Sequence, residues 1–296
     1  MTRSLVVAGT LDDALAELAG GSRVVAGGTD LVVGARQGKA TLPERLVAVH
    51  RLAELAAFDE TDGTLRLGAT VTHARIASDT LIRSRLTALA DASSIVGSHA
   101  TRAQGTIGGN VMNASPAAET VGPLLCFGAT VRLRSSSGSR SVPVEELATG
   151  PGRTVAEPGE LLEAIEVPLP ADGTGSAYVR LEYRRQMEIA VVGVTAVVRL
   201  DADRVADARV AITALAPTVR RVPEAEALLV GAAGDEETLT KLGEAVASAS
   251  RPISDVRASA AYRAAMAAVI ARRAVQFALA RARGADVPVP ANASDL

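Results

Sequence analysis

Two Gly-Gly corners constrain this chain more than any other feature of its sequence. Residues 24–31 read VVAGGTDL and residues 106–113 read TIGGNVMN, so each pair follows a short apolar run and precedes small polar residues. Glycine admits positive φ and leaves consecutive backbone N–H groups open to a ligand. Each corner is therefore either an ordinary tight turn or part of a site for a phosphate-containing ligand. Neither matches G-x-G-x-x-G or the Walker pattern, which excludes a Rossmann or P-loop site.

The segments around the corners alternate between strand and helix patterns. Thr10, with Asp13 at the capping-box position, predicts a helix over 11–19 that ends at Gly20-Gly21. Apolar runs and alternation predict a buried strand at 23–28, strands at 44–50 and 64–70, helical segments with breaks over 71–96, and a hairpin with a Ser/Gly turn over 129–147.

The last third of the chain has a different pattern. A loop containing Gly173 and Gly175 is a plausible domain boundary. Beyond it, 189–200 and 206–216 predict paired antiparallel strands joined by a turn at 201–207, and helical spacing follows over 222–231, 235–249 and 253–284. The sequence thus predicts an α+β protein whose smaller C-terminal domain combines an antiparallel sheet with helices.

Composition excludes several classes of function. The formal net charge is −2 and no basic stripe is interleaved with aromatic residues, so we predict no nucleic-acid partner. A single cysteine, Cys126, cannot supply the four thiolates of an iron–sulfur cluster, and its apolar surroundings predict a buried residue. The three histidines lack metal-ligand spacing, so no metal site is predicted.

The apolar runs are too short for a signal peptide or a membrane-spanning helix. The N-terminal run leads directly into a helical pattern, and the longest run elsewhere covers only 189–198. We therefore expect a soluble cytoplasmic protein.

Five ordered segments carry a family resemblance. VVAGGTDL, TIGGN, NASPAAETVGPLL (113–125), YRRQMEIAVVGVTAVV (183–198) and SAAYRAAMAAVIARRA (259–274) resemble the FAD-binding medium subunit of the molybdenum hydroxylases, the carbon monoxide and xanthine dehydrogenase type. The resemblance implies an FAD-binding domain over 1–172, made of two α/β subdomains at about 1–55 and 56–172. A C-terminal α/β domain would follow over 173–296.

The resemblance also implies where a noncovalent FAD would bind. The first corner would wrap the diphosphate through Val24, Val25, Ala26, Gly27, Gly28, Thr29, Asp30 and Leu31, and the second would contact the diphosphate and flavin side through Thr106, Ile107, Gly108, Gly109 and Asn110. Glu119 would reach the adenosine end, Leu162 would pack on the adenine, and Arg180 would reach the flavin. Arg180 could instead be a solvated surface residue. If FAD lies against Gly108, Gly108→Val would give soluble protein without flavin.

Three functions fit these features. The favoured one is an electron-transfer subunit that receives electrons from [2Fe–2S] clusters of a small partner subunit and passes them through FAD to an external acceptor. A large subunit with the molybdenum cofactor would oxidise the substrate, in a heterohexamer. The second is a stand-alone flavin oxidase or dehydrogenase, for which His99 and Tyr183 are candidate acids or bases. The third is a nucleotide-binding scaffold without redox turnover. No side chain of this chain is predicted to be catalytic.

Overall fold

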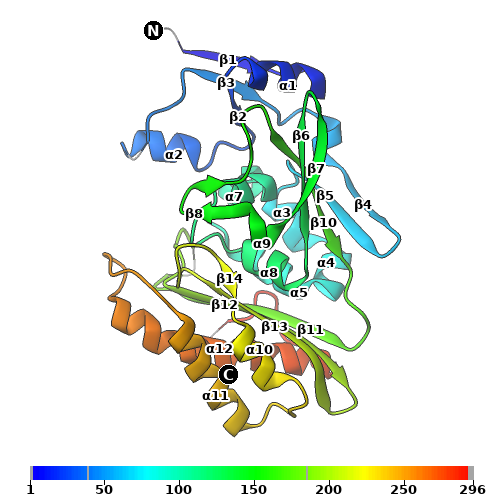
Figure 1. The fold of residues 1–296 in the computed structure, drawn as a ribbon, viewed down its shortest axis with the longest axis vertical. Coiled ribbons are helices and arrows are strands. Elements are labelled where there is room, and N and C mark those ends of the chain that lie inside the picture. The colour runs from blue at the N-terminus through cyan, green and yellow to red at the C-terminus, as the bar shows by residue number, and fades with distance from the viewer. Residues whose placement is uncertain (1–2, 39, 185, 293–296) are drawn as a thin grey trace.

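The computed structural model describes residues 3–38, 40–184 and 186–292. Three sheets follow one another along the long axis, from the N-terminal end at the top of Figure 1 to the C-terminal helices at the bottom. The first is parallel, with the order β1 (Ser4–Val7), β3 (Arg45–Ala48) and β2 (Arg23–Val25). Helix α1 (Leu11–Ala19) packs on it. The predicted capping box is confirmed: Thr10 Oγ1 accepts a bond from Asp13 N at 3.1 Å, and Asp13 Oδ2 accepts one from Thr10 N at 3.0 Å.

The second sheet is antiparallel and carries most of the helices of the N-terminal half. Its strand order is β4 (Phe58–Thr61), β5 (Thr64–Gly68), β10 (Leu161–Pro168), β6 (Thr130–Ser135) and β7 (Gly138–Pro143). Around it lie η1 (Ala53–Ala56), α3 (His73–Ser78), α4 (Thr80–Arg85), α5 (Thr87–Ile95), α6 (His99–Gln104), α7 (Ile107–Met112), α8 (Val121–Cys126), α9 (Val144–Leu147) and the pair β8 (Ala148–Gly150) and β9 (Arg153–Thr154). Helix α2 (Leu31–Arg36) follows β2 of the first sheet. The predicted hairpin is present as β6 and β7, and Cys126 is buried as predicted.

The third sheet explains the long apolar run near residue 195. It contains β11 (Thr174–Leu181), β12 (Val192–Asp201), β13 (Arg204–Thr213) and β14 (Arg220–Arg221), all antiparallel. Helices α10 (Pro223–Leu229), α11 (Glu236–Ala249) and α12 (Ala260–Ala282) cover one face, and α5 and α8 pack against the other (Figure 1). Because both faces are covered, residues on both sides of β12 are apolar and buried. The predicted α+β fold is confirmed.

Two predicted elements differ from the observed ones. The strand predicted over 23–28 is short and partly exposed, because β2 forms the edge of its sheet. The last helix starts at Ala260 instead of 253. Asp255 accepts bonds from the Arg257 side chain and backbone and from Arg263, which hold the preceding segment in a turn, and Ser259 then caps the helix.

A buried carboxylate ties the two halves together. Asp91 on α5 is fully buried and accepts hydrogen bonds from Arg281 Nη1 at 2.6 Å and Nη2 at 3.0 Å. It also accepts bonds from the backbone N–H of Tyr178, at 3.1 Å, and of Ala291, at 3.0 Å. A single side chain of the N-terminal half therefore anchors β11, α12 and the segment after α12.

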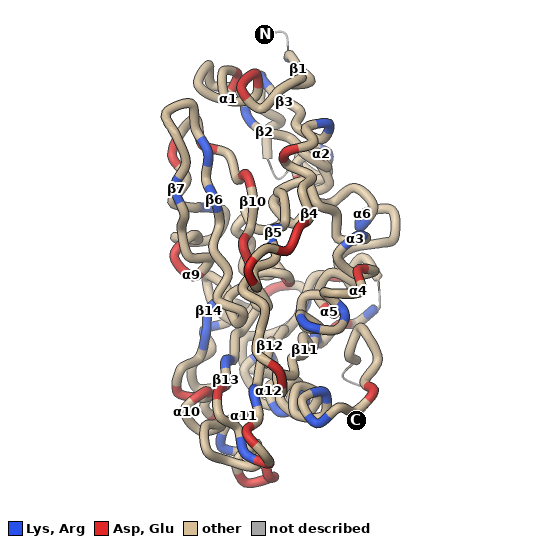
Figure 2. The backbone as a smooth tube through the Cα atoms, turned by 90° about the vertical axis from the view of Figure 1, so that its right-hand side faces the viewer, with Lys and Arg blue, Asp and Glu red and all other residues tan. Residues whose placement is uncertain are grey.

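Acidic and basic residues are interspersed along the backbone in the view of Figure 2, without a continuous run of basic positions on that side. Within the described part of the chain, no helix is long and apolar enough to cross a membrane. The same residues contain no group of three or more His, Cys, Asp or Glu side chains that could hold a metal ion.

Candidate functional site

The first corner connects β2 to α2 and requires glycine at one position. Gly28 has a φ of +68°, in the left-handed region that side chains with a Cβ rarely adopt. Asp30 stands at the N-cap of α2, but its side chain makes no cap bond. Partial desolvation raises the pKa of this carboxyl, although the residue as a whole is exposed.

The backbone N–H groups of the first corner are free within the described structure. From Gly27 to Leu31, no amide donates a hydrogen bond to another described residue. Consecutive unpaired N–H groups in a turn form a concave binding surface for anions. This corner can therefore hold a phosphate group with its backbone alone.

The second corner differs from the first because its amides are already paired. The bonds are Ile107 N to Val71 O at 2.9 Å, Gly108 N to Ala69 O at 3.0 Å, Gly109 N to Thr106 Oγ1 at 3.0 Å, and Asn110 N to Thr106 O at 3.0 Å. These amides have partners because the carbonyls of Ala69 and Val71 lie against the corner and Thr106 caps α7. The expected contact of this corner with the diphosphate stays a prediction.

Gly108 is explained by packing within the protein. A Cβ atom at this position would lie 2.6 Å from Ala69 O and 2.7 Å from Ala69 Cβ. Gly108→Val is thus expected to disturb the fold itself, and the predicted soluble, flavin-free variant does not follow from the structure.

The two corners lie side by side through glycine contacts. A Cβ atom on Gly27 would overlap the carbonyl group of Gln104, so only hydrogen fits between these two backbones. Gly105, the residue after Gln104, also lies beside the first corner, because a Cβ there would be 3.4 Å from Thr29 Oγ1. Gly27 and Gln104, which are 77 positions apart in the chain, are thereby held in van der Waals contact.

Polar side chains extend the second corner toward α8. Asn110 is half-buried, and its Oδ1 accepts a hydrogen bond of 2.7 Å from Thr120 Oγ1. Sequence reasoning missed Thr120. Its residue type and its place before α8 indicate a helix cap, but it makes no side-chain cap bond.

Glu119 and Arg180 form a buried ion pair with each other. The two ends of an extended FAD are much farther apart than two bonded side chains, so Glu119 cannot reach the adenosine end while Arg180 reaches the flavin. At most one of these two predicted assignments holds. The surface alternative for Arg180 is also wrong, because the residue lies within β11 and is 5% exposed.

Electrostatics around this pair are dominated by burial. Burial raises the pKa of Glu119 to about 7 against the opposing attraction of Arg180. For Arg180, burial alone would lower the pKa, but Glu119, Tyr178 and Glu182 together raise it. The guanidinium also pairs with Glu182 and donates to the Ile95 carbonyl at 3.2 Å, so it is held at the C-terminal end of α5.

Leu162 lies in the hydrophobic core beside Leu133 and is 5% exposed. Its side chain packs in that core, and the predicted contact with an adenine stays a prediction.

His73 was also missed by sequence reasoning, which considered His73 only as a metal ligand. It is 2% exposed, its backbone N–H donates to Gly105 O at 3.1 Å, and its ring lies against Gly105. Burial, followed by repulsion from Arg102, lowers the pKa of His73 to about 4, so the ring is neutral at pH 7. The apolar residues of α3 do not follow a pattern that would indicate burial of His73.

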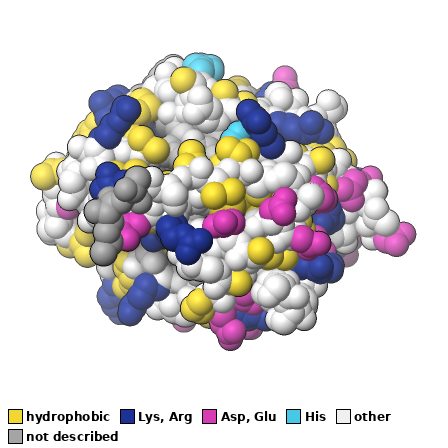
Figure 3. Space-filling view, turned by 90° about the horizontal axis from the view of Figure 1, so that it is seen from above, with side chains coloured by type: hydrophobic (Ala, Val, Ile, Leu, Met, Phe, Trp, Pro, Cys, Tyr) yellow, Lys and Arg dark blue, Asp and Glu magenta, His cyan; other side chains and the backbone are white. Residues whose placement is uncertain are grey.

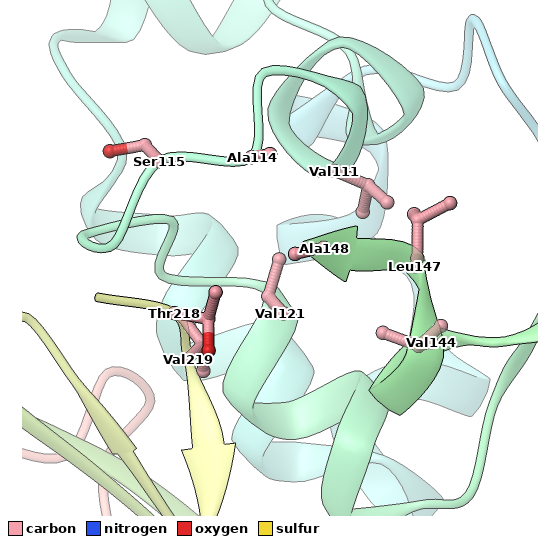
Figure 4. A pocket seen from close by; sticks show the side chains of 9 residues that line it. All are labelled: Val111, Ala114, Ser115, Val121, Val144, Leu147, Ala148, Thr218 and Val219. Carbon is pink, nitrogen blue, oxygen red and sulfur yellow. The ribbon is translucent and has the colours of Figure 1, made fainter. Parts of the chain in front are cut away.

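Two cavities near the corners do not include them. An apolar one lies between α7, α8 and α9 (Figure 4), and its volume of about 10 Å³ is at the lower limit for one water molecule. A larger open hollow of about 700 Å³ borders α2 and is lined by Arg3, Val32 and Arg36, among others. Residues 24–31 and 106–110 line neither of these two cavities.

Gly27→Ala tests whether the contact between Gly27 and Gln104 holds the corners together. We expect it to lower the free energy of unfolding by about 2–3 kcal/mol, because the new methyl group forces two backbones apart. Urea unfolding followed by circular dichroism measures the change. Gly34→Ala is the matched control, since a Cβ there meets nothing within 4 Å. Equal stability of Gly27→Ala and wild type would contradict the packing described here.

Comparison with known proteins identifies the family. Residues 2–170 match the FAD binding domain in molybdopterin dehydrogenase, and residues 176–278 match the CO dehydrogenase flavoprotein C-terminal domain. The carbon monoxide dehydrogenase medium chain of Afipia carboxidovorans is 34% identical over 270 residues, which cover 91% of this chain and 93% of that protein. The xanthine dehydrogenase FAD-binding subunit of Escherichia coli O157:H7 is 32% identical over 281 residues, 94% of this chain and 96% of that one.

Solved structures agree with the sequence comparison. Carbon monoxide dehydrogenase from Hydrogenophaga pseudoflava superimposes with a TM-score of 0.91 at 30% identity, over 95% of this chain and 98% of that one. The match covers the segments that contain the two corners and the third sheet. This chain therefore belongs to the family of FAD-binding medium subunits of the molybdopterin dehydrogenases, the carbon monoxide and xanthine dehydrogenase type, and is an oxidoreductase subunit.

Proposed function

We propose that this chain binds FAD noncovalently and passes electrons from the iron–sulfur clusters of a partner subunit to an external acceptor. Bound FAD supplies redox chemistry that links one-electron donors to a two-electron acceptor. The residues of this chain bind and orient the cofactor and shield it from water.

The row of free amides from Gly27 to Leu31 carries the proposal. A diphosphate needs several donors within a short distance, and this corner offers consecutive N–H groups with no competing bond to a described residue. Thr29 adds a hydroxyl beside Gly105. We therefore assign the diphosphate to residues 24–31.

The second corner would contribute in a different way. Its paired amides rigidify α7, and Asn110 presents a side chain at the surface beside the exposed Gly109. We assign Thr106, Ile107, Gly108 and Gly109 to the support of this position, and Asn110 to direct contact. Glu119 and Arg180 would act as one unit at a single end of the cofactor.

The division of the chain is proposed at residues 172 and 173. The FAD-binding domain would comprise 1–172, with subdomains at about 1–55 and 56–172, and the C-terminal domain 173–296. The separate sheets support this division.

We further propose a heterohexamer with a large molybdenum-binding subunit and a small subunit carrying [2Fe–2S] clusters. The names of the relatives, medium chain and FAD-binding subunit, support partner chains. Exposed apolar side chains also support them, since large exposed patches mark interfaces. They occur on β1 and α2 (Leu5, Val6, Val7, Val32 and Val33) and in the segments before β12 and around the start of α12 (Tyr183, Met187, Ile189, Ile253, Val256 and Tyr262). Figure 3 shows apolar side chains on the N-terminal end, interspersed with charged ones.

The stand-alone enzyme receives less support from the structure. An acid or base acting beside the flavin must be positioned, and His99 is exposed. Tyr183 is 65% exposed, and its hydroxyl donates to the Arg257 carbonyl at 2.5 Å. The scaffold alternative differs in having no redox turnover.

Selectivity among flavins tests the diphosphate assignment. We expect FAD to bind at least about 100-fold more tightly than riboflavin, because bonds to a charged diphosphate each contribute roughly 1.5–3 kcal/mol. Isothermal titration calorimetry of flavin-free protein measures both affinities, with Gly34→Ala as a variant that retains the difference. Equal affinity for the two flavins would contradict the assignment, and no binding of either would refute the proposed function.

The choice of electron donor separates the electron-transfer subunit from the alternatives. FAD-loaded protein is expected to be reduced by a reduced [2Fe–2S] ferredoxin and not by xanthine or nicotinate. Anaerobic stopped-flow measurement of flavin absorbance provides the test. Rapid reduction by an organic donor would favour a stand-alone enzyme, and reduction by none would favour a scaffold.

A further inference from the structure

We infer that Thr120 is a positioning residue that fixes the side-chain amide of Asn110 so that its NH₂ group faces FAD. The inference rests on the proposed function, because it concerns a contact to bound FAD. The Thr120 hydroxyl does not make the helix-capping bond that its N-cap position predicts.

Thr120 stands at the N-cap of α8, where threonine ordinarily accepts a bond from its own helix. It makes no such bond. Its side chain donates to Asn110 Oδ1 at 2.7 Å, and the residue is completely buried. The hydroxyl is thus directed away from its own helix and toward the last residue of the TIGGN corner.

This bond decides how the Asn110 amide is oriented. Asparagine has an acceptor oxygen and a donor NH₂ on opposite branches, and the partners of one branch determine where the other points. Because Thr120 donates to Oδ1, the NH₂ branch is directed to the other side. Asn110 is half-buried, its NH₂ group bonds to no described residue, and its nitrogen is not among the buried atoms that lack a partner, so the NH₂ branch is accessible.

The orientation matters because the corner has few other donors. The amides of residues 107–110 are paired, and Thr106, whose Oγ1 accepts a bond from Gly109 N, is buried. The NH₂ group of the half-buried Asn110 is consequently the more accessible donor that this corner can direct to a ligand. The isoalloxazine ring and the ribityl chain of FAD carry oxygen and nitrogen acceptors, and an NH₂ group matches them.

Three variants test the inference. Thr120→Val removes the hydroxyl at nearly constant volume, and it is expected to weaken FAD binding about tenfold, the effect of losing one well-oriented hydrogen bond. Thr120→Ser retains the donor and should bind FAD within about twofold of wild type. Thr195→Val is the matched control, since Thr195 is also a buried threonine hydroxyl but has no bonded partner among the described residues.

The readouts separate positioning from stability. FAD affinity is measured by quenching of flavin fluorescence, the flavin absorption spectrum reports its surroundings, and thermal unfolding reports the fold. We expect Thr120→Val to change affinity and spectrum, and Thr195→Val to change neither. Wild-type affinity in Thr120→Val would overturn the inference, as would loss of affinity in both Thr120→Val and a folded Thr120→Ser.

A second variant covers the case in which Thr120→Val does not fold. Asn110→Asp keeps an oxygen for Thr120 but removes the NH₂ group, so it should weaken FAD binding more than tenfold. Binding as tight as wild type would overturn the inference. If wild-type protein binds no FAD, the proposed function fails. NMR of the Asn110 side-chain amide then still tests the orientation. If the NH₂ signals are unchanged in Thr120→Ser and also in a folded Thr120→Val, Thr120 does not fix the orientation of this amide.

Discussion

The candidate site depends on the backbone contact between Gly27 and Gln104. No side chain fits between them, so the first corner rests directly on the residues that lead into the second. Gly105 lies next to this contact, where a Cβ would crowd the Thr101 carbonyl at 2.9 Å and touch Thr29 and the His73 ring. Close approach of two backbones fixes distance more tightly than a contact between flexible side chains, because neither surface can change rotamer. A ligand that spans both corners then meets a junction of defined width.

The two glycine pairs look alike in sequence but have different physical roles. At the first, Gly28 permits a left-handed turn that leaves the following amides unpaired. At the second, Gly108 allows α7 to approach Ala69, and its amides bond within the protein. The first corner thus offers backbone donors, whereas the second serves as a rigid support for Asn110. This asymmetry suits a cofactor with a charged diphosphate and an uncharged ring system, which need different donors.

Local structure was predictable where it is determined by neighbouring residues. The α1 capping box, the β6–β7 hairpin and the paired strands β12 and β13 all follow from short-range patterns. The family, and with it the α+β fold, followed from five ordered segments, each too short to be specific alone.

The remaining features depend on contacts between distant segments. The pairing of Glu119 with Arg180 joins residues 61 positions apart, and the carbonyls of Ala69 and Val71 reach the second corner from another element. The start of α12 was placed too early for a different, local reason: Asp255 pairs with Arg257 and Arg263 and holds the preceding segment in a turn, which the spacing of apolar residues does not show. The burial of His73 and Thr120 could not be predicted from the sequence, since it follows from the packing of α3 and α8.

We propose that the first corner binds FAD through free backbone amides while the amides of the second corner remain bonded within the protein. Residue-resolved amide hydrogen exchange by NMR, with and without FAD, tests this proposal. We expect fast exchange from Gly27 to Leu31 in the flavin-free protein and strong protection after FAD is added, with slow exchange from Ile107 to Asn110 in both states. Protection that appears at residues 107–110 instead, with no change from Gly27 to Leu31, would contradict it.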